Sequence, residues 1–332
     1  MKQAATVSWF SREIFFPQEE MNDWGDIEIG VDAISERYDG KGVSVAILDT
    51  GVDRRHPDLS VSAGINLVSN QDFSNFQDDY GHGTFVAGVL ACLKNQKGLI
   101  GVCPRIRLLA VRIGQFNEQT RSFENDVVEA LEKGVNWAID NKADIINLSM
   151  EFQTISNDSR ATLEAVFQNA VNHGVLLVAA TGNGGRSEAA YPASSKFVLG
   201  VGALGSTKNG GLLVPARIWD QKGYYYVPWT SNYGKGLDVL APGVRVPSSL
   251  PTAAGANYAW GNGTSIAAPY VSGVCAILLE ADKTRRSNTR MYVEKVYKVI
   301  RESAQPLLGI TAFFQGSGIV NIPRALQIIK DL

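Results

Sequence analysis

The sequence predicts an α/β fold of three layers, in which helices cover both faces of a mainly parallel central sheet. Short apolar runs recur along the chain, and they are continuous rather than alternating, as in strands buried on both faces. Segments with helical spacing of apolar residues separate these runs, and such alternation is typical of parallel sheets. No repeat or low-complexity linker interrupts the 332 residues, so we expect one large domain.

The elements follow from these patterns. A fourth helix should begin close to Ser265, because Pro269 fits an α-helix only near its first turn. In such folds the functional residues gather at the carboxyl ends of the strands. The predicted strands are residues 43–49, 106–113, 143–149, 175–180, 197–203 and 237–241, and the other predicted helices are 83–93, 124–141 and 160–172.

Composition narrows the class of protein. The chain is 45% hydrophobic and 19% charged with a net charge of −2, so nucleic-acid binding has little electrostatic support. No apolar run reaches membrane-spanning length, and the N-terminus lacks the apolar core of a signal peptide. Cys92, Cys103 and Cys275 form no CxxC pair, which argues against a disulfide framework or a zinc site. These features favour a cytoplasmic location, although a mature fragment of a longer precursor remains open.

Three polar residues stand out at the ends of predicted elements. Asp49 ends a buried strand, which alone is typical of a turn-capping aspartate. His82 lies between Gly81 and Gly83, and such glycines suit a place where backbone or substrate must approach closely. Ser265 begins a buried helix among small residues, which alone is typical of tight packing. Together the three supply a nucleophile, a base and an orienting acid.

The sequence around these residues resembles the subtilisin-like serine proteases. The segments "AILDTGVDRRHPDL", "GHGTFVAGVLA" and "GTSIAAPYVSG" resemble the three active-site motifs of that family, in the family's order of Asp, His and Ser. The segments "AATGNGG" and "LDVLAPG" resemble two further family segments. The resemblance extends over residues 23–325, nearly the whole chain.

The resemblance implies a serine endopeptidase that acts on peptides or proteins and needs no cofactor for its chemistry. Ser265 would attack the scissile carbonyl, and His82 would take the serine proton and return it to the leaving amine. Asp49 would hold the imidazole. Asn183 would donate its side-chain N–H to the oxyanion, together with the Ser265 backbone. Without the other three residues, Asn183 would be interpreted as a turn asparagine.

The same resemblance assigns a substrate pocket. The segment "INLSMEF", residues 146–152, matches the strand and wall of the pocket for the residue before the cut. Relatives usually carry glycines where Glu151 and Phe152 stand. Glu151 would narrow the pocket, favour Arg or Lys through a charge-assisted bond, or point into solvent. The assigned substrate-binding residues are Ser149, Met150, Glu151, Glu124, Gly182 and Thr264.

An acidic segment replaces the Gly-rich segment with which relatives pair the substrate backbone. This segment, "QFNEQTRSFEND", contains Glu118, Glu124 and Asp126. Acidic residues on both sides of a cleft would favour basic peptides. Such a charge run equally fits a solvated face.

Family members often bind structural calcium, which provides two candidate ligands here. Asp58 and Asn95 match ligand positions. Lys94 and Lys97 are unfavourable neighbours for a divalent cation, although backbone carbonyls would still be available.

Other departures from the family pattern concern aromatic residues. Phe85 and Tyr270 replace histidines that are usual in the motifs, and we expect them to be packing variants. The connection over residues 204–229 is longer than usual and rich in Trp and Tyr. It would form a binding surface or fold back on the domain.

Residues 1–22 form a short N-terminal extension ahead of a catalytic domain at residues 23–332. The extension is too short for an independently stable propeptide, and it resembles the intracellular branch of the family, whose short extensions lie across the cleft. The segment Phe15-Phe16-Pro17 would inhibit the enzyme in this way, or the extension is a loose tail.

We therefore predict a subtilisin-like serine endopeptidase, with trimming of precursor peptides after basic residues as the sharper hypothesis. The alternative is a catalytically silent binding protein with the same fold. An esterase is disfavoured because the G-x-S-x-G elbow is missing. The sequence leaves the oligomeric state open.

Overall fold

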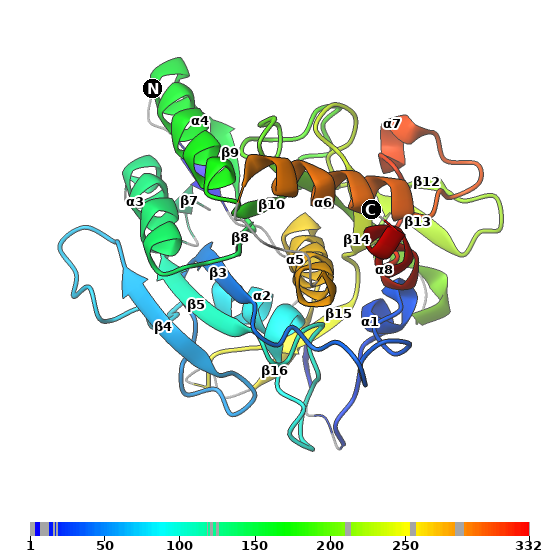
Figure 1. The fold of residues 1–332 in the computed structure, drawn as a ribbon, viewed down its shortest axis with the longest axis horizontal. Helices are drawn as coiled ribbons and strands as arrows, with labels where there is room; N and C mark the ends of the chain where they lie inside the picture. The colour runs from blue at the N-terminus through cyan, green and yellow to red at the C-terminus, as the bar shows by residue number, and fades with distance from the viewer. Residues whose placement is uncertain are drawn as a thin grey trace.

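A computed structural model describes most of the chain. Figure 1 shows a central sheet between helices, with the long helix α5 near the middle of the molecule. The described residues are 4–6, 13–15, 17, 19–117, 119, 122–123, 126–209, 214–252, 257–282 and 289–331.

The central sheet has nine strands in the order β12-β13-β11-β10-β8-β3-β5-β4, with β14 also paired to β11. All pairings from β4 to β11 and β14 are parallel, and only β13 and β12 run antiparallel at one edge. The strands are β3 (Ser44–Asp49), β4 (Val61–Asn66), β5 (Arg107–Arg112), β8 (Ile145–Leu148), β10 (Leu176–Ala180), β11 (Leu199–Ser206), β12 (Ala216–Trp219), β13 (Tyr225–Pro228) and β14 (Val239–Pro242).

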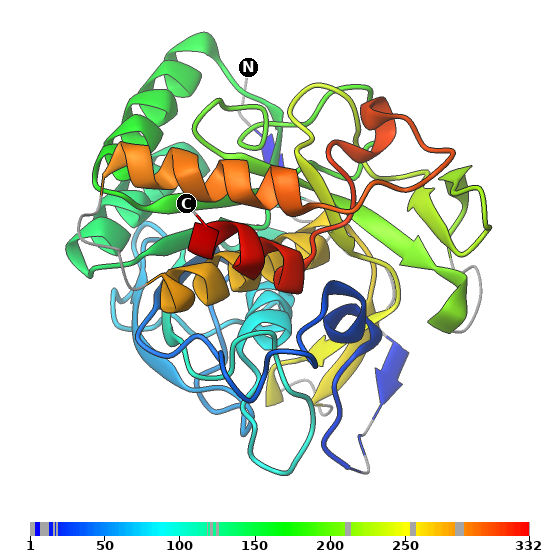
Figure 2. The same cartoon turned by 45° about the vertical axis from the view of Figure 1, so that its right-hand side comes forward.

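Helices cover both faces of this sheet, so the predicted three-layer α/β architecture is confirmed (Figure 1). Helices α3 (Val127–Asp140) and α4 (Asn157–Asn172) lie on one face, and α2 (His82–Ala91) and α5 (Thr264–Ala281) lie on the other. Helices α6 (Arg290–Ser303) and α8 (Ile322–Asp331) pack side by side outside α5 (Figure 2). The shorter helices are α1 (Trp24–Ile29), α7 (Ala312–Gln315) and the 3₁₀ turn η1 (Thr207–Asn209).

Helix α5 is apolar because it lies in the hydrophobic core of the molecule. It is long and apolar enough to cross a membrane, but 89% of its apolar window is buried inside the fold. The helix begins after Gly263, whose φ of +146° disfavours any other residue, and Pro269 lies in its second turn. The start predicted near Ser265 is therefore confirmed.

Three small sheets attach further segments to this body. Strand β1 (Ala4–Thr6) pairs antiparallel with β9 (Glu151–Thr154), so the N-terminal extension lies beside the predicted pocket wall. Strand β2 (Glu13–Phe15) pairs with β16 (Tyr258–Gly261), which pairs with β15 (Val246–Ser249). Strands β6 (Phe116–Asn117) and β7 (Ser122–Phe123) form a hairpin.

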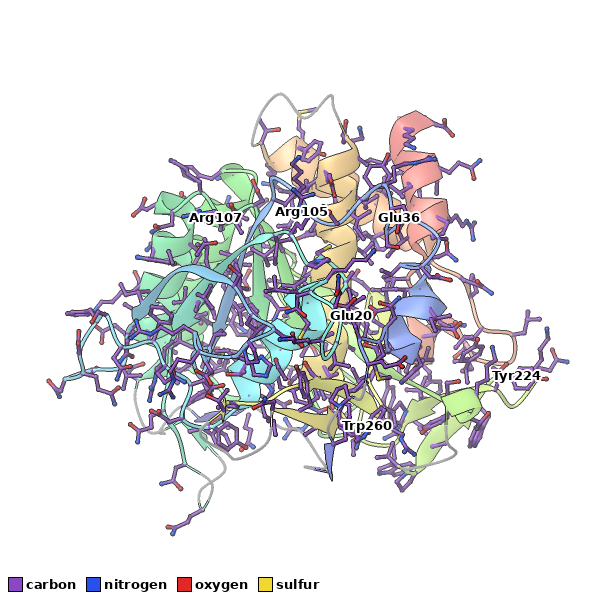
Figure 3. The ribbon with its side chains drawn as sticks, turned by 90° about the horizontal axis from the view of Figure 1, so that it is seen from below. Glu20, Glu36, Arg105, Arg107, Tyr224 and Trp260 are labelled. Atoms are coloured by element: carbon purple, nitrogen blue, oxygen red, sulfur yellow. The ribbon has the colours of Figure 1, made fainter. Side chains whose placement is uncertain are left out.

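The six predicted strands and four predicted helices all form, with ends that shift by a few residues. The edge strand β4 and the hairpin β12–β13 were not predicted. The long aromatic connection forms that hairpin: Tyr226 is fully buried, whereas Trp229 is 58% exposed. Figure 3 shows Tyr224 at the outer edge of the hairpin.

Candidate active site

Asp49 lies at the carboxyl end of β3, which pairs with the parallel strands β5 and β8 on either side. Its Oδ1 and Oδ2 lie 2.8 and 3.0 Å from Nδ1 of His82. Asp49 is fully buried and His82 is 1% exposed, so this hydrogen-bonded pair is shielded from water. A buried pair of this kind fixes which imidazole nitrogen faces the carboxylate.

The glycines on both sides of His82 have separate structural reasons. Gly81 adopts a φ of +108° at the start of α2, which favours glycine. A Cβ on Gly83 would lie 2.1 Å from the carbonyl oxygen of Gly51. The prediction that the backbone approaches closely here is confirmed, since Gly83 packs directly against the turn that follows Asp49.

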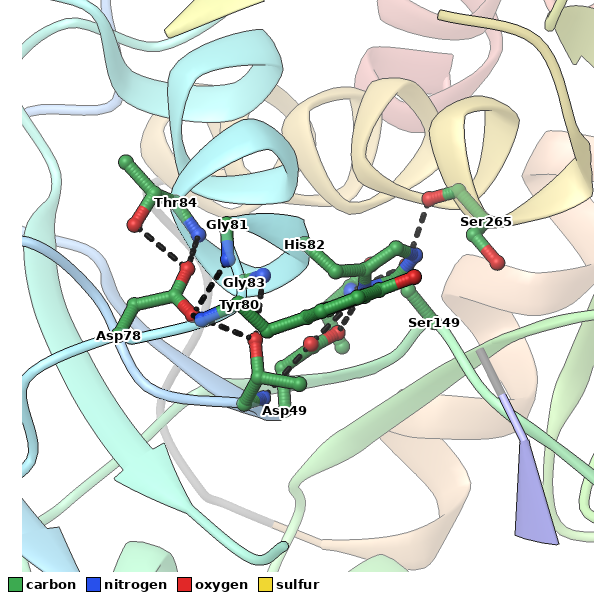
Figure 4. Close-up of polar contacts among 11 residues, drawn as sticks. Asp49, Asp78, Tyr80, Gly81, His82, Gly83, Thr84, Ser149 and Ser265 are labelled. Carbon is green, nitrogen blue, oxygen red and sulfur yellow. Dashed lines mark hydrogen bonds and ion pairs between the residues drawn. The ribbon is translucent and has the colours of Figure 1, made fainter. Parts of the chain in front are cut away.

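Ser265 is the second residue of α5 and is 2% exposed. Ser149 donates a hydrogen bond from its hydroxyl to the backbone carbonyl of Ser265 at 2.7 Å, which ties β8 to the start of α5. Figure 4 shows the side chain of His82 lying between Asp49 and Ser265. The structure therefore places the three side chains at the end of β3 and the starts of α2 and α5, with Asp49 and His82 in direct contact.

Asn183 lies in the turn after β10, and its side chain is oriented by Thr264. Its Oδ1 accepts from the Thr264 backbone N–H at 2.9 Å and from the Thr264 hydroxyl at 3.2 Å. The Thr264 hydroxyl also accepts from the N–H of Gly182, which has a φ of +102°. The Asn183 side chain is therefore held next to Ser265, and its amide nitrogen is the atom that could donate to an oxyanion.

Glu151 does not point into solvent, so that interpretation is wrong. The residue is 9% exposed, and its Oε1 accepts from the Asn183 backbone N–H at 3.2 Å. A Cβ on Gly182 would lie 2.2 Å from Oε2, so the carboxylate packs directly against the Gly182 backbone. Burial raises the pKa of Glu151, while the Asn183 N–H and Arg186 lower it.

Two of the other predicted pocket residues, Ser149 and Met150, are buried in the fold. Met150 is 1% exposed and lies in the core beneath β9. Ser149 uses its hydroxyl on the Ser265 backbone rather than facing a cleft. Glu124 and Glu118 lie outside the described residues.

Sequence reasoning missed a buried carboxylate beside His82. Asp78 is 2% exposed and accepts hydrogen bonds from Tyr80, Gly81 and Thr84 (Figure 4). It also accepts from the Thr50 hydroxyl. The available signal was an aspartate four residues before His82, in a stretch of turn residues.

The residues predicted to hold calcium do not fit a cation. Asp58 is fully buried, and its carboxylate accepts from Tyr258 OH at 2.6 Å, Leu99 N–H at 3.1 Å and Asn95 Nδ2 at 2.9 Å. A calcium ion needs oxygen lone pairs, whereas this carboxylate is surrounded by N–H and O–H donors. Among the residues that the structure describes, no three His, Cys, Asp or Glu side chains form a metal cluster. The calcium prediction is therefore not supported here.

The fold and this arrangement define a subtilisin-like serine endopeptidase, and comparison with known proteins agrees. The family model for the subtilase family matches residues 40–318, so the chain belongs to that family. A subtilisin from Bacillus pumilus is 34% identical over 297 residues, covering 88% of this chain and 94% of the relative. Subtilisin BL from Lederbergia lenta is 34% identical over 305 residues, covering 92% and 98%. M-protease from Shouchella clausii (strain KSM-K16) is 35% identical, covering 92% and 70%.

Proposed function

We propose that Asp49, His82 and Ser265 act as the catalytic triad of this endopeptidase. His82 takes the proton from the Ser265 hydroxyl as that oxygen attacks the scissile carbonyl, and then returns it to the leaving amine. Asp49 holds Nδ1 of His82 and stabilises the imidazolium that forms. The observation that supports this assignment best is the buried Asp49–His82 contact at 2.8 Å beside the start of α5.

Asn183 stabilises the oxyanion of the tetrahedral intermediate. Thr264 fixes its amide so that a donor is aimed before the reaction begins, and preorganised donors cost no reorganisation at that moment. The backbone N–H of Ser265 supplies the second donor.

Glu151 favours substrates with Arg or Lys before the cut, which is the chemistry of a precursor-processing protease. Its carboxylate is held against the Asn183 backbone inside the pocket wall, where water is largely excluded. A guanidinium or ammonium that enters the pocket would form a charge-assisted bond with it. Arg186 is near enough to lower the pKa of Glu151, so the substrate's cation would compete with Arg186.

Cleavage of a mixed peptide library, read by mass spectrometry, tests both proposals. Ser265→Ala should lower activity about a millionfold, the size of effect known for subtilisin of the same family. Glu151→Gln should reduce the preference for Arg and Lys by roughly tenfold, because one charge-assisted bond is lost. The exposed Glu302→Gln is the matched control and should leave the preference unchanged.

Three outcomes of this assay are informative. Serine-dependent cuts that follow apolar residues, equally in Glu151→Gln, would keep the protease and overturn the basic preference. Intact binding of peptides without any cut would favour the catalytically silent binding protein. Cuts that persist in Ser265→Ala would overturn the triad.

The N-terminal extension inhibits this cleavage by occupying the pocket wall. In β1, Thr6 pairs with Glu151 and Ala5 with Phe152, so a described part of the extension takes the backbone hydrogen bonds that an extended substrate needs. The expected contact through Phe15-Phe16-Pro17 lies elsewhere: the Phe15 ring lies 5.0 Å from Trp260 and 5.9 Å from Tyr258 on β16. Phe16 lies outside the described residues.

A chain that starts at Asn22 tests the inhibition. It should cleave peptides at least tenfold faster than the full chain, because the paired strand competes at a high effective concentration. Adding a peptide of residues 1–21 should restore inhibition. Equal rates for the two chains would contradict the inhibition.

We also propose a cytoplasmic location, which the three free and buried cysteines favour.

A further inference from the structure

The region between Asp49 and His82 contains a buried hydroxyl–carboxylate pair that no part of the proposed chemistry uses. We propose that Thr50 and Asp78 are positioning residues that hold Asp49 and His82 in alignment during catalysis. This inference rests on the proposed triad. Thr50 acts on Asp49 through its backbone N–H, and Asp78 acts on the segment that carries His82 by accepting from its backbone N–H groups. Figure 4 shows Asp78 beside this segment.

Asp78 binds both ends of the segment that carries His82. Its Oδ1 accepts from the backbone N–H of Tyr80 at 3.0 Å and of Gly81 at 2.8 Å. Its Oδ2 accepts from the Thr84 N–H at 2.8 Å and the Thr84 hydroxyl at 2.7 Å. His82 therefore lies between residues that are fixed to the same carboxylate.

Thr50 joins this carboxylate to Asp49. Its hydroxyl donates to Asp78 Oδ1 at 2.9 Å and accepts from the Gly83 N–H at 2.9 Å. Its backbone N–H donates to Asp49 Oδ1 at 2.7 Å, the same oxygen that faces His82. One residue thus touches the acid of the triad, the residue after the base, and the carboxylate that fixes the base's turn.

The Thr50 hydroxyl and the Asp78 carboxyl group each have several hydrogen-bond partners. Thr50 has one hydroxyl proton, which Asp78 accepts, and one lone pair is used by Gly83. Asp78 receives five donors on its two oxygens, although it is almost fully buried. Burial and the charge of Asp49 raise the pKa of Asp78, while the N–H and hydroxyl donors lower it. Such a network is rigid, because moving any one member leaves a buried polar group unpaired.

This rigidity matters because His82 must be aligned with two partners at once. Its Nε2 would accept the proton of Ser265 while Asp49 holds Nδ1. A displacement of roughly 1 Å at such a contact costs about 100-fold in rate. The pair should therefore affect kcat rather than KM, because it touches no substrate.

Thr50→Val tests the inference, because valine keeps the shape of threonine and removes only the hydroxyl. We expect kcat to fall between tenfold and 100-fold with KM within about twofold. Thr50→Ser, which keeps the hydroxyl, should restore kcat to within about threefold of the parent. Rates are expressed per active site, counted by titration with a fluorophosphonate, so that loss of folded protein is not mistaken for loss of kcat.

Ser248→Ala is the matched control. Ser248 also donates a buried hydroxyl to α2, at the Phe85 carbonyl 2.6 Å away, but it does not touch Asp49 or residues 80–84. It should lower stability and leave kcat per site unchanged. If Thr50→Val does not fold, Asp78→Asn provides the same test, because it removes the charge and leaves the Thr84 donors without an acceptor.

Each remaining outcome decides the question. An unchanged kcat in Thr50→Val, or a Thr50→Ser variant as slow as Thr50→Val, would overturn the positioning role. A loss of kcat in Ser248→Ala equal to that in Thr50→Val would also overturn it, since any buried hydroxyl on α2 would then have the same effect. A parent enzyme without Ser265-dependent cleavage would instead overturn the proposed triad.

Discussion

Two clusters of buried carboxyl groups in this molecule are built on opposite principles. Beside the triad, the two oxygens of Asp78 receive five donors. At helix α1, Asp23 and Asp26 lie next to one another, and Asp26 Oδ1 is buried with no hydrogen-bond partner among the residues that the structure describes. Burial raises the pKa in both clusters, but the carboxyl group of Asp78 has many donors whereas that of Asp26 is short of them.

The second cluster links the N-terminal helix α1 to the central helix α5. Asp23 caps α1 by accepting from the N–H groups of Gly25 and Asp26, and the hydroxyl of Tyr270 donates to both of its oxygens at 2.7 and 2.6 Å. Burial raises the pKa of Asp23 to about 6. Burial and the charge of Asp23 raise the pKa of Asp26 well above its usual range.

The two clusters differ in how many donors face their carboxyl groups. Near His82 a rigid backbone serves catalysis, and five donors hold the two oxygens of Asp78. At α1 the carboxyl groups serve attachment, and a proton can replace a missing donor. Activity should therefore depend on the first cluster and stability against pH on the second.

The largest expected effect is a difference in kcat between a variant beside His82 and a variant in helix α1. Asp49→Asn should lower kcat by about 10⁴-fold, a size known for subtilisin and its counterparts. The amide of asparagine would hold the imidazole of His82 in the wrong tautomer. Asp23→Asn should leave kcat per titrated site within about twofold. Steady-state kinetics of both variants check this, and a large loss of kcat in Asp23→Asn would remove the distinction.

A smaller effect concerns the oxyanion. Asn183→Ala should lower kcat by roughly 100- to 1000-fold with little change in KM, a range for which subtilisin is itself the known example. Its unfolding free energy should fall by roughly 1–3 kcal/mol, since the N–H and hydroxyl of the buried Thr264 lose their acceptor. A rise in KM with unchanged kcat would instead place Asn183 in ground-state binding.

The second cluster predicts a pH dependence of stability. The pKa of Asp23 is raised from 3.8 to about 6, so its contribution is fully present below pH 4 and is lost as the pH rises through about 6. Two pKa units correspond to at most about 3 kcal/mol. Urea unfolding between pH 4 and 7 should therefore show a falling unfolding free energy that flattens in Asp23→Asn. A parallel curve for the variant would contradict the assignment.

Tyr270→Phe should have a smaller effect on the same link. It removes the hydroxyl from a buried carboxyl group and should lower the unfolding free energy by roughly 1–3 kcal/mol. Phe85→Tyr is a useful contrast, because Phe85 is 1% exposed and an added hydroxyl in such a tightly packed place should also destabilise. Thermal unfolding measures both. No change in Tyr270→Phe would show that the hydrogen bond contributes nothing.

The smallest expected effect is at Asp58. Because protein donors already surround this carboxylate, EDTA or added calcium should shift the melting temperature by no more than about 1 °C, since a ligand stabilises only by binding the folded state. A calcium-dependent rise of several degrees would restore the metal site.

The sequence predicted the parts of the site that lie at the ends of regular elements. Asp49 ends a buried apolar strand, and His82 and Ser265 begin apolar helices, so periodicity and motif order place them. The parallel sheet followed from its continuous apolar runs. Strand β4 was missed because it is only partly buried and lacks such a run.

What could not be predicted depends on contacts between distant residues. Tyr270 was expected to be a packing variant, but its hydroxyl binds Asp23, 247 positions earlier. The calcium ligands were inferred from position, whereas Tyr258, 200 residues from Asp58, supplies the donor that changes the site. The orientation of Glu151 likewise depends on the Asn183 backbone, which periodicity does not reveal.

Labelling by a fluorophosphonate, located by mass spectrometry in the chain that starts at Asn22, tests the central claim most directly. We predict one adduct per chain, on Ser265, that abolishes peptide cleavage, and a labelling rate that falls by several orders of magnitude in His82→Ala. An adduct on another residue, or labelling of Ser265 at the same rate without His82, would contradict the assignment of Asp49, His82 and Ser265 as one catalytic unit.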